Sequence, residues 1–231
     1  MRTPSLLLLL LVAGCSTSPD GNVTGSPSRT TTPVASPDQT TAVPAPTQTT
    51  PPQSSTNFSV VRLPAGAAAQ RAGLESEGAL EGLQFTDGAG TNVLLLRRRP
   101  NTQGGAELLA DHIVYPNSQE RQVLREVRDG VPDCSVDMIA EFVPESLTVT
   151  DYDEDGYGEA SFAYRLNCSG DPSPDEQKLL VLEQGEKYIL RGFALSPLEP
   201  FVDPRPEPAP SAWPPGTYDD SLLRFRDYAR K

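Results

Sequence analysis

The composition of this chain changes abruptly at position 58, and that change limits where a hydrophobic core can form. Between positions 16 and 57, 26 of the 42 residues are Ser, Thr or Pro, and none is aromatic. Such a segment buries too little apolar surface to offset the conformational entropy that folding removes. We therefore expect a disordered tether over residues 15–57 and one globular domain over residues 58–231, which is long enough for a substantial core.

The first 14 residues have the pattern of a signal peptide. Arg2 precedes a leucine-rich run that ends in small residues before Cys15. The run is too short to cross a bilayer, because a spanning helix needs about 20 apolar residues. We therefore expect residues 1–14 to be cleaved during export from the cytoplasm.

The motif Val12-Ala13-Gly14-Cys15 resembles the lipobox of bacterial lipoproteins. The resemblance implies cleavage before Cys15, lipidation of that residue and anchoring in a membrane through the lipid. It places the protein in the bacterial cell envelope, outward of the cytoplasmic membrane, and Ser16 favours the outer membrane if the bacterial sorting rule applies. The alternative is an ordinary signal peptide followed by a free or disulfide-bonded Cys15.

Hydrophobic periodicity favours β-strands over helices in the globular domain. Apolar runs and period-two alternation, bounded by turns that contain Gly, are typical of strands. The predicted strands are residues 91–96, 108–115, 177–183 and 187–195. The first is expected to be buried and central, and the last two are expected to form a hairpin. We expect a mainly β fold: a single antiparallel, sandwich or barrel-like domain with a C-terminal helix.

Four other segments of the domain have patterns of their own. Residues 65–83 fit a loop or a weak helix, and residues 121–131 fit the period of either a strand or a helix. Residues 197–216 contain eight prolines, which exclude a central strand and predict a segment that wraps the surface. Apolar residues recur at helical spacing in residues 219–231, which predicts a helix packed on the sheet, with membrane contact as the alternative.

Two of the three cysteines, Cys134 and Cys168, remain as a pair if Cys15 carries lipid. Disulfides are expected in exported chains. In strand alternation, both cysteines share a face with apolar side chains, which are Val136, Met138, Ala140 and Phe142 for the first and Ala160, Phe162, Tyr164 and Leu166 for the second. We therefore predict a buried disulfide rather than two unpaired core cysteines.

The acidic charge of the chain is concentrated in one segment. The net charge is −12, and residues 129–164 contain ten Asp or Glu but no Lys or Arg. Charges of one sign repel one another when folding brings them together, unless a cation lies among them. The alternative is that these side chains point into solvent. The acidic balance argues against nucleic acid as a partner.

Within this segment, five residues have the spacing of an oxygen-ligand calcium loop. Carboxylates lie at positions 1, 3, 5 and 9, a glycine at position 6 permits a sharp turn, and position 7 offers a backbone carbonyl. The predicted ligands are Asp151, Asp153, Asp155, Tyr157 and Glu159. We predict a structural calcium ion, with a solvated acidic turn, magnesium and manganese as the alternatives.

The loop differs from an EF-hand, because position 12 is Phe162 and both flanks alternate as strands do. The arrangement of a strand, the loop motif D-x-D-x-D-G-x-x-E and a second strand resembles the calcium loops of FG-GAP and VCBS-type propeller repeats. The chain has one copy and no internal period, so this resemblance does not carry a propeller fold.

A longer stretch, residues 83–192, is similar to a family of bacterial envelope proteins loosely named for surface polysaccharide biosynthesis. The matching features are T-D-G-x-G-x-N-V-L-L-L at residues 86–96, D-C-x-V-D at residues 133–137, the acidic loop and residues 166–174. The chain has Pro172 where the family pattern has Val. The resemblance implies an envelope setting, with envelope glycan or a protein as candidate partner.

No catalytic motif stands out. His112 is the only histidine, and a lone histidine in a strand is typically a packed or surface residue. Asp137 and Glu141 are one of many carboxylate pairs that could serve glycoside hydrolysis, and Lys178 and Arg191 are expected to form ion pairs. We predict a calcium-stabilised binding or structural module, with an enzyme or accessory factor acting on surface polysaccharide as the alternative.

Overall fold

The computed structural model describes residues 58–118, 120–196 and 200–231. The predicted signal peptide at residues 1–14, the lipidation site Cys15 and the predicted tether over residues 15–57 lie outside this range.

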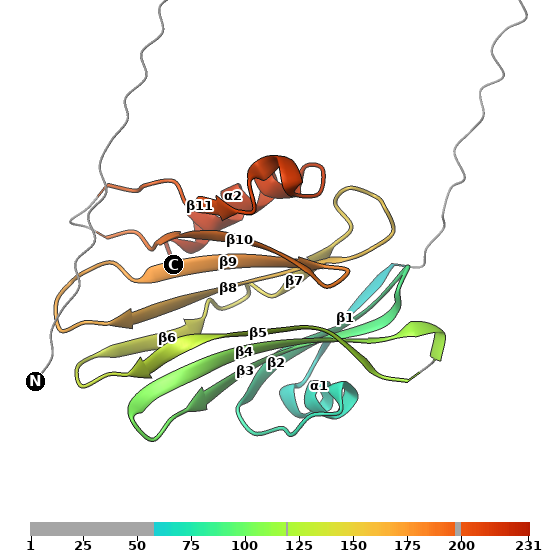
Figure 1. Ribbon diagram of the computed structural model, residues 1–231, viewed down its shortest axis with the longest axis horizontal. Coiled ribbons are helices and arrows are strands. Elements are labelled where there is room, and N and C mark those ends of the chain that lie inside the picture. Colours follow the sequence, from blue (N-terminus) through green and yellow to red (C-terminus); the bar gives the residue numbers. More distant parts are fainter. Residues whose placement is uncertain (1–57, 119, 197–199) are drawn as a thin grey trace, which may run out of the picture. The chain divides into compact units, whose positions relative to one another are not determined.

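The described chain forms two antiparallel β-sheets that pack face to face, with one helix on the outer side of each sheet (Figure 1). Sheet A is a five-stranded meander whose strand order follows the sequence: β1 (Ser59–Leu63), β2 (Ala79–Asp87), β3 (Gly90–Pro100), β4 (Gly104–Tyr115) and β5 (Gln122–Asp133). Sheet B has the order β11-β10-β9-β8-β6, with β7 also beside β8: β6 (Met138–Phe142), β7 (Thr148–Thr150), β8 (Glu159–Cys168), β9 (Glu176–Glu183), β10 (Glu186–Phe193) and β11 (Arg205–Glu207). The helices are α1 (Ala65–Ala72) and α2 (Thr217–Tyr228), and two short 3-10 turns are η1 (Pro116–Ser118) and η2 (Pro210–Ala212). The predicted mainly β sandwich with a C-terminal helix is therefore confirmed.

The period-two pattern of the strands divides the apolar side chains among three clusters. The largest cluster fills the space between the sheets and contains Phe85 and Phe162. A second cluster lies between sheet B and α2, where Phe225 and Trp213 are buried. The third lies between sheet A and the alanine-rich face of α1. Each sheet is therefore covered on both faces along part of its length.

The predicted hairpin is confirmed as β9 and β10. Gln184 and Gly185 connect the strands and have φ angles of 45° and 87°. Two consecutive residues at positive φ are typical of the hairpin turn whose twist matches that of the strands, and glycine adopts this conformation without strain.

The structure resolves the segments with two possible assignments. The stretch over residues 65–83 is a helix only as far as Ala72, and from Ala79 it is strand β2, which the sequence did not predict. The ambiguous residues 121–131 are strand β5, whose Val127 and Val131 point into the core between the sheets. The predicted strands at residues 91–96 and 108–115 are confirmed as β3 and β4.

The C-terminal segments also match their predictions. The described part of the proline-rich stretch contributes one strand to the sheets, β11, which has three residues at the edge of sheet B, as expected for a segment with few amide donors. Its residues 197–199 are outside the described part of the chain. The predicted helix forms at Thr217–Tyr228 and packs on sheet B through Phe225 and Tyr228.

A disulfide joins Cys134 and Cys168, whose Cα atoms are 5.7 Å apart, but the prediction that it is buried is wrong. Cys168 is exposed at the end of β8, and Cys134 is half-buried. The chain bends after Cys134 and enters β6 only at Met138, so Val136 does not share the strand's apolar face and is 52% exposed.

Candidate metal centre

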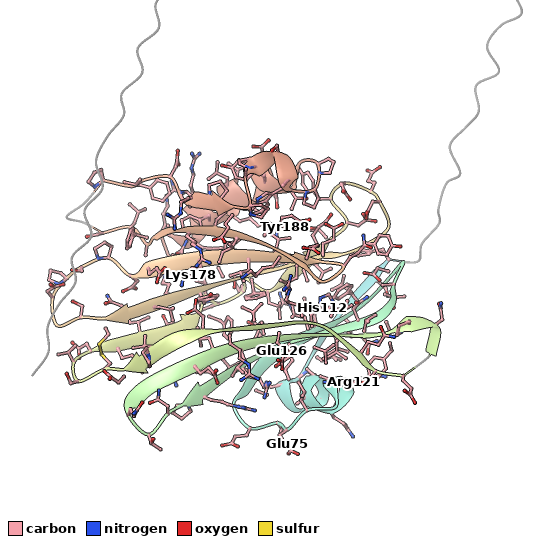
Figure 2. The ribbon with its side chains drawn as sticks, viewed as in Figure 1. Glu75, His112, Arg121, Glu126, Lys178 and Tyr188 are labelled. Atoms are coloured by element: carbon pink, nitrogen blue, oxygen red, sulfur yellow. A yellow bond between two sulfur atoms is a disulfide. The ribbon has the colours of Figure 1, made fainter. Side chains whose placement is uncertain are left out.

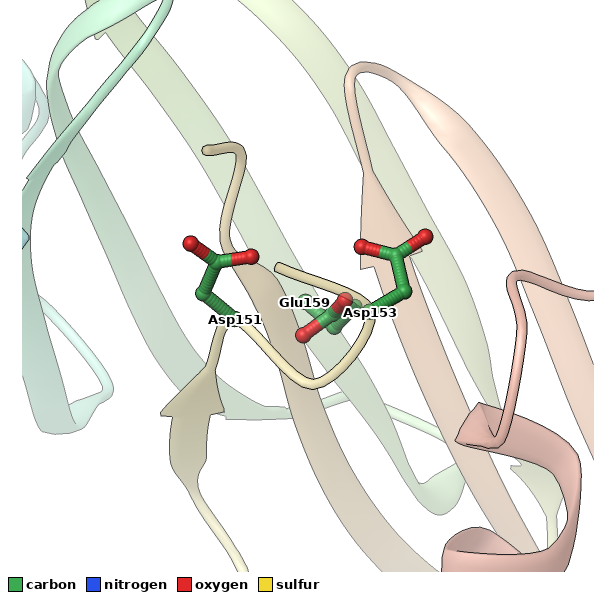
Figure 3. A group of neighbouring side chains, drawn as sticks. All are labelled: Asp151, Asp153 and Glu159. Atoms are coloured by element: carbon green, nitrogen blue, oxygen red, sulfur yellow. The ribbon is translucent and has the colours of Figure 1, made fainter. Parts of the chain in front are cut away.

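The acidic loop connects β7 to β8 and is shaped by its own carboxylates. The Gly156 amide donates to Asp151 Oδ1 at 3.3 Å, and the Tyr157 amide donates to Asp155 Oδ1 at 2.8 Å. The Asp155 amide donates to Asp153 Oδ1 at 3.3 Å. Gly156 has a φ of 89°, which favours glycine at this sharp turn. Figure 3 shows Asp151 and Asp153 on either side of Glu159 at this loop.

The folded chain brings the predicted carboxylates together in two overlapping groups and adds one carboxylate from outside the loop. Oxygens of Asp151, Asp153 and Glu159 all lie within 4.8 Å of one another. The same limit holds for Asp153, Asp155 and Glu183, so Asp153 belongs to both groups. The two groups contain four of the five predicted ligands. Tyr157 is half-buried with its ring over Gly88, and its carbonyl stays a predicted ligand.

Glu159 is the most informative member of the cluster. It is only 2% exposed at the start of β8, and its Oε2 accepts hydrogen bonds from the Tyr152 amide at 2.8 Å and from Thr150 Oγ1 at 3.2 Å. Its Oε1 is buried and accepts no hydrogen bond from any residue that the structure describes. A buried carboxylate oxygen without a partner is costly, because burial removes its hydration and nothing replaces it. Glu159 Oε1 therefore has no partner that offsets the cost of its burial.

Glu183 is a member of the cluster that sequence reasoning missed. It is the last residue of β9 and is 7% exposed. Antiparallel pairing sets Ala160 opposite Leu182, so the next pair along the strands places Glu159 beside Glu183. The only signal in the sequence was the acidic residue at the start of the predicted hairpin turn, and its position depends on how β8 pairs with β9.

The carboxylates raise one another's proton affinity. Burial, followed by the charges of Asp155, Asp153 and Glu159, raises the pKa of Glu183 to about 7. Burial also raises the pKa of Glu159 and of Asp153 above their usual values. Across residues 58–118, 120–196 and 200–231, no ion pair with Lys, Arg or His involves any carboxylate of the two groups. The cluster is thus a concentration of negative charge to which none of these residues supplies a cation.

A second layer of hydrogen bonds fixes the loop from the opposite sheet. Asp87, at the end of β2, accepts a hydrogen bond from the Gly158 amide at 3.1 Å. Its other oxygen accepts from Asn92 Nδ2 at 2.8 Å, and Asn92 Oδ1 lies 3.0 Å from His112 Nε2. Asp87, Asn92 and His112 are all buried, and His112 is labelled in Figure 2. His112 is therefore a packed residue, as expected.

The other candidate residues lie outside the cluster. Lys178 pairs with Asp129 and Glu176, and Arg191 pairs with Glu207, so both predicted ion-pair partners are confirmed in that role. Asp137 and Glu141, the carboxylate pair considered for glycoside hydrolysis, are both exposed.

The chemistry of the donors defines the class of ion. All donors are oxygens, and carboxylates with backbone carbonyls suit hard cations such as calcium, magnesium and manganese rather than zinc or copper. The fold and the site thus define a β-sandwich with a cluster of acidic side chains that could hold a metal ion, of which Glu159 and Glu183 are buried.

A scan against models of protein families and searches of curated proteins and of solved structures find no match to this chain. Neither helix of the described residues has the length and apolar character of a membrane span.

Proposed function

We propose that this protein is a lipid-anchored envelope protein whose β-sandwich is a binding or structural module stabilised by calcium. The observation that carries the metal site is Glu159 Oε1, which is buried among other carboxylates and accepts no hydrogen bond. A cation beside this oxygen would replace its lost hydration and offset the repulsion within the cluster.

Calcium suits the site better than magnesium. Calcium accepts six to eight oxygen ligands in irregular geometry, whereas magnesium demands a near-ideal octahedron and retains water. A loop that offers several carboxylates at once favours the larger ion. Outside the cytoplasm, an affinity of about 10⁻⁴ to 10⁻³ M suffices for a structural role.

Two observations support the anchor. Two of the three cysteines form a disulfide with each other, which leaves Cys15 available for lipid. A disulfide is also typical of proteins that fold outside the cytoplasm. Export followed by lipidation at Cys15 accounts for both, with the outer membrane as the favoured location and envelope glycan or a protein as the candidate partner of the domain.

Thermal unfolding of the purified protein tests the metal proposal. Calcium at about 100 times its dissociation constant stabilises the folded state by about 2.7 kcal/mol, which raises the melting temperature by roughly 5 to 10 °C for a domain of this size. Asp153→Asn should abolish the rise. Glu154→Gln is the matched control, because Glu154 lies in the same loop, is exposed and belongs to neither carboxylate group. An equal melting temperature in calcium and in chelator would refute the proposal.

Fractionation of bacterial cells tests the anchor. The wild-type protein should sediment with membranes and incorporate labelled fatty acid, whereas Cys15→Ser should do neither. Retention of Cys15→Ser in the membrane fraction would contradict lipidation as the sole anchor.

A further inference from the structure

We propose that Glu183 completes the coordination of the ion, so that one cation joins the β7–β8 loop to the β9–β10 hairpin. This inference rests on the proposed calcium site and assigns to it a ligand that lies outside the loop motif. The ion then acts as a clamp between two segments of sheet B that are distant in sequence.

The loop itself has no ligand for one side of the ion. In an EF-hand, a bidentate Glu at position 12 closes the coordination sphere. Position 12 here is Phe162, which is 1% exposed and packed in the core between the sheets. A carboxylate from another segment must replace that ligand if the ion is to have six or more oxygen neighbours.

Glu183 lies where the missing ligand is needed. One of its oxygens is within 4.8 Å of oxygens of Asp153 and Asp155, and Asp153 is likewise within 4.8 Å of Asp151 and Glu159. Calcium–oxygen distances are about 2.3 to 2.6 Å, so two ligands of one ion can lie up to about 5 Å apart. The two groups are separate sets that share Asp153, so we place the ion beside Asp153, between them.

The pairing of the strands gives an independent reason for a cation at this place. Extending the register of β8 and β9 by one residue beyond Ala160 and Leu182 sets Glu159 opposite Glu183 on one face of sheet B. The two side chains are 2% and 7% exposed, and no described basic residue forms an ion pair with either. Like charges directly opposite each other destabilise a sheet, and burial increases the penalty. The unpartnered Oε1 of Glu159 shows that the described residues do not supply the balancing group.

The consequence is a hairpin whose tip is ordered by the ion. Glu183 is followed directly by the turn residues Gln184 and Gly185, and its neighbour across the turn is Glu186. Tyr188 lies on the same hairpin, where burial, followed by the charges of Glu183 and Glu186, raises its pKa. Calcium should therefore slow the motion of the hairpin as well as that of the loop.

Calorimetric titration of the full chain with calcium chloride tests the assignment. The wild type should bind one ion, and Glu183→Gln, which keeps the size of the side chain and removes its charge, should weaken the affinity at least tenfold. Glu183→Asp should also weaken it, because the carboxylate is withdrawn by one methylene. Glu186→Gln is the matched control across the same turn and should stay within twofold of wild type, since Glu186 is exposed and belongs to neither carboxylate group.

Hydrogen exchange supplies the readout that a change in folding alone would not produce. In the wild type, calcium should slow exchange at the amides of both the loop and residues 184–187, and in Glu183→Gln it should protect the loop only. Wild-type affinity in Glu183→Gln would overturn the assignment, as would two ions per chain of which Glu183→Gln loses one. Absence of calcium binding by the wild type would instead overturn the proposed function.

Discussion

Asp87 Oδ2, at the end of β2 in sheet A, accepts a 3.1 Å hydrogen bond from the amide of Gly158, the residue before Glu159 in sheet B. The other oxygen of Asp87 accepts from the Ala89 amide at 2.9 Å and from Asn92 Nδ2 at 2.8 Å. The Gly88 amide also donates to the Gly156 carbonyl at 2.8 Å. The turn after β2 thus fixes the backbone from which Glu159 reaches the candidate metal centre.

Removing this contact should weaken both the fold and the site. Asp87→Ala leaves three donors without their acceptor, which we expect to lower the free energy of unfolding by about 3 kcal/mol. The affinity for calcium should fall as well, because the loop loses its support. Urea unfolding in chelator and calcium titration measure the two effects separately. Asp133→Ala, an exposed change at the end of β5, should alter stability by less than about 0.5 kcal/mol. Asp87→Ala with wild-type values for both quantities would show that the contact is unimportant.

His112 should make stability depend on pH. Burial lowers its pKa from 6.5 to about 4, and its Nδ1 is buried without a partner. Because the folded-state pKa lies below the unfolded one, this contribution is complete above about pH 6.5 and disappears as the pH falls through about 4. Its full size is about 3 kcal/mol.

The measurement is urea unfolding between pH 4 and 7 at the same calcium concentration for both proteins. Wild type should lose stability towards pH 4, and His112→Gln should lose less over the same interval, since Gln does not titrate. Parallel pH profiles for the two proteins would exclude His112 as the titrating group.

Lys178 and Asp129 connect the two sheets through a 2.7 Å ion pair, to which Tyr164 adds a 2.7 Å hydrogen bond (Figure 2 labels Lys178). Lys178 is 6% exposed, so Lys178→Met removes a buried charge and leaves Asp129 without its cation. We expect a loss of about 3 kcal/mol, part of which Lys178→Met combined with Asp129→Asn should restore. Chemical unfolding of the two single variants and the double variant gives the coupling energy.

The same pair predicts a response to acid. Burial alone raises the pKa of Asp129, but hydrogen bonds from Lys178 and Tyr164 outweigh it and bring the pKa below its usual value. The stabilisation is therefore present above the unfolded pKa of about 4 and is lost as the pH falls through the lower folded value. Lys178→Met should unfold at a higher pH than wild type, and an unchanged acid midpoint would contradict this account.

The disulfide between Cys134 and Cys168 closes a segment with a sequence separation of 34 residues. By the chain-entropy model, removing it with Cys134→Ala and Cys168→Ala should lower stability by about 4 kcal/mol. Calcium should still raise the melting temperature of this variant, because neither cysteine belongs to the carboxylate groups. Loss of the calcium response together with the disulfide would mean that the two features are not independent.

Local patterns predicted the parts of the fold that depend on local chemistry. The apolar run of β3, the turn between β9 and β10 and the helical spacing in α2 each reflect neighbours in the sequence, and all three are confirmed. Residues 121–131 were ambiguous because the pairing of β5 with β4 is irregular at His112, so their alternation is imperfect. The exposure of the disulfide could not be predicted, because the bend after Cys134 interrupts the alternation on which the prediction depended.

The residues of the candidate site also fall into two classes, those predicted by local spacing and those that depend on strand pairing and sheet packing. Spacing alone identified Asp151, Asp153, Asp155 and Glu159, because consecutive turns of one loop bring these side chains together. Glu183 and Asp87 enter from β9 and β2, and their positions follow from strand pairing and from the packing of the two sheets. No spacing within one segment encodes either contact.

The most direct test of the metal centre is an anomalous difference map from crystals of the protein grown with calcium. We predict one peak that lies about 2.3 to 2.6 Å from carboxylate oxygens of Asp153, Glu159 and Glu183. A map without a peak in this cluster, with Glu159 Oε1 still lacking any ligand, would contradict the account.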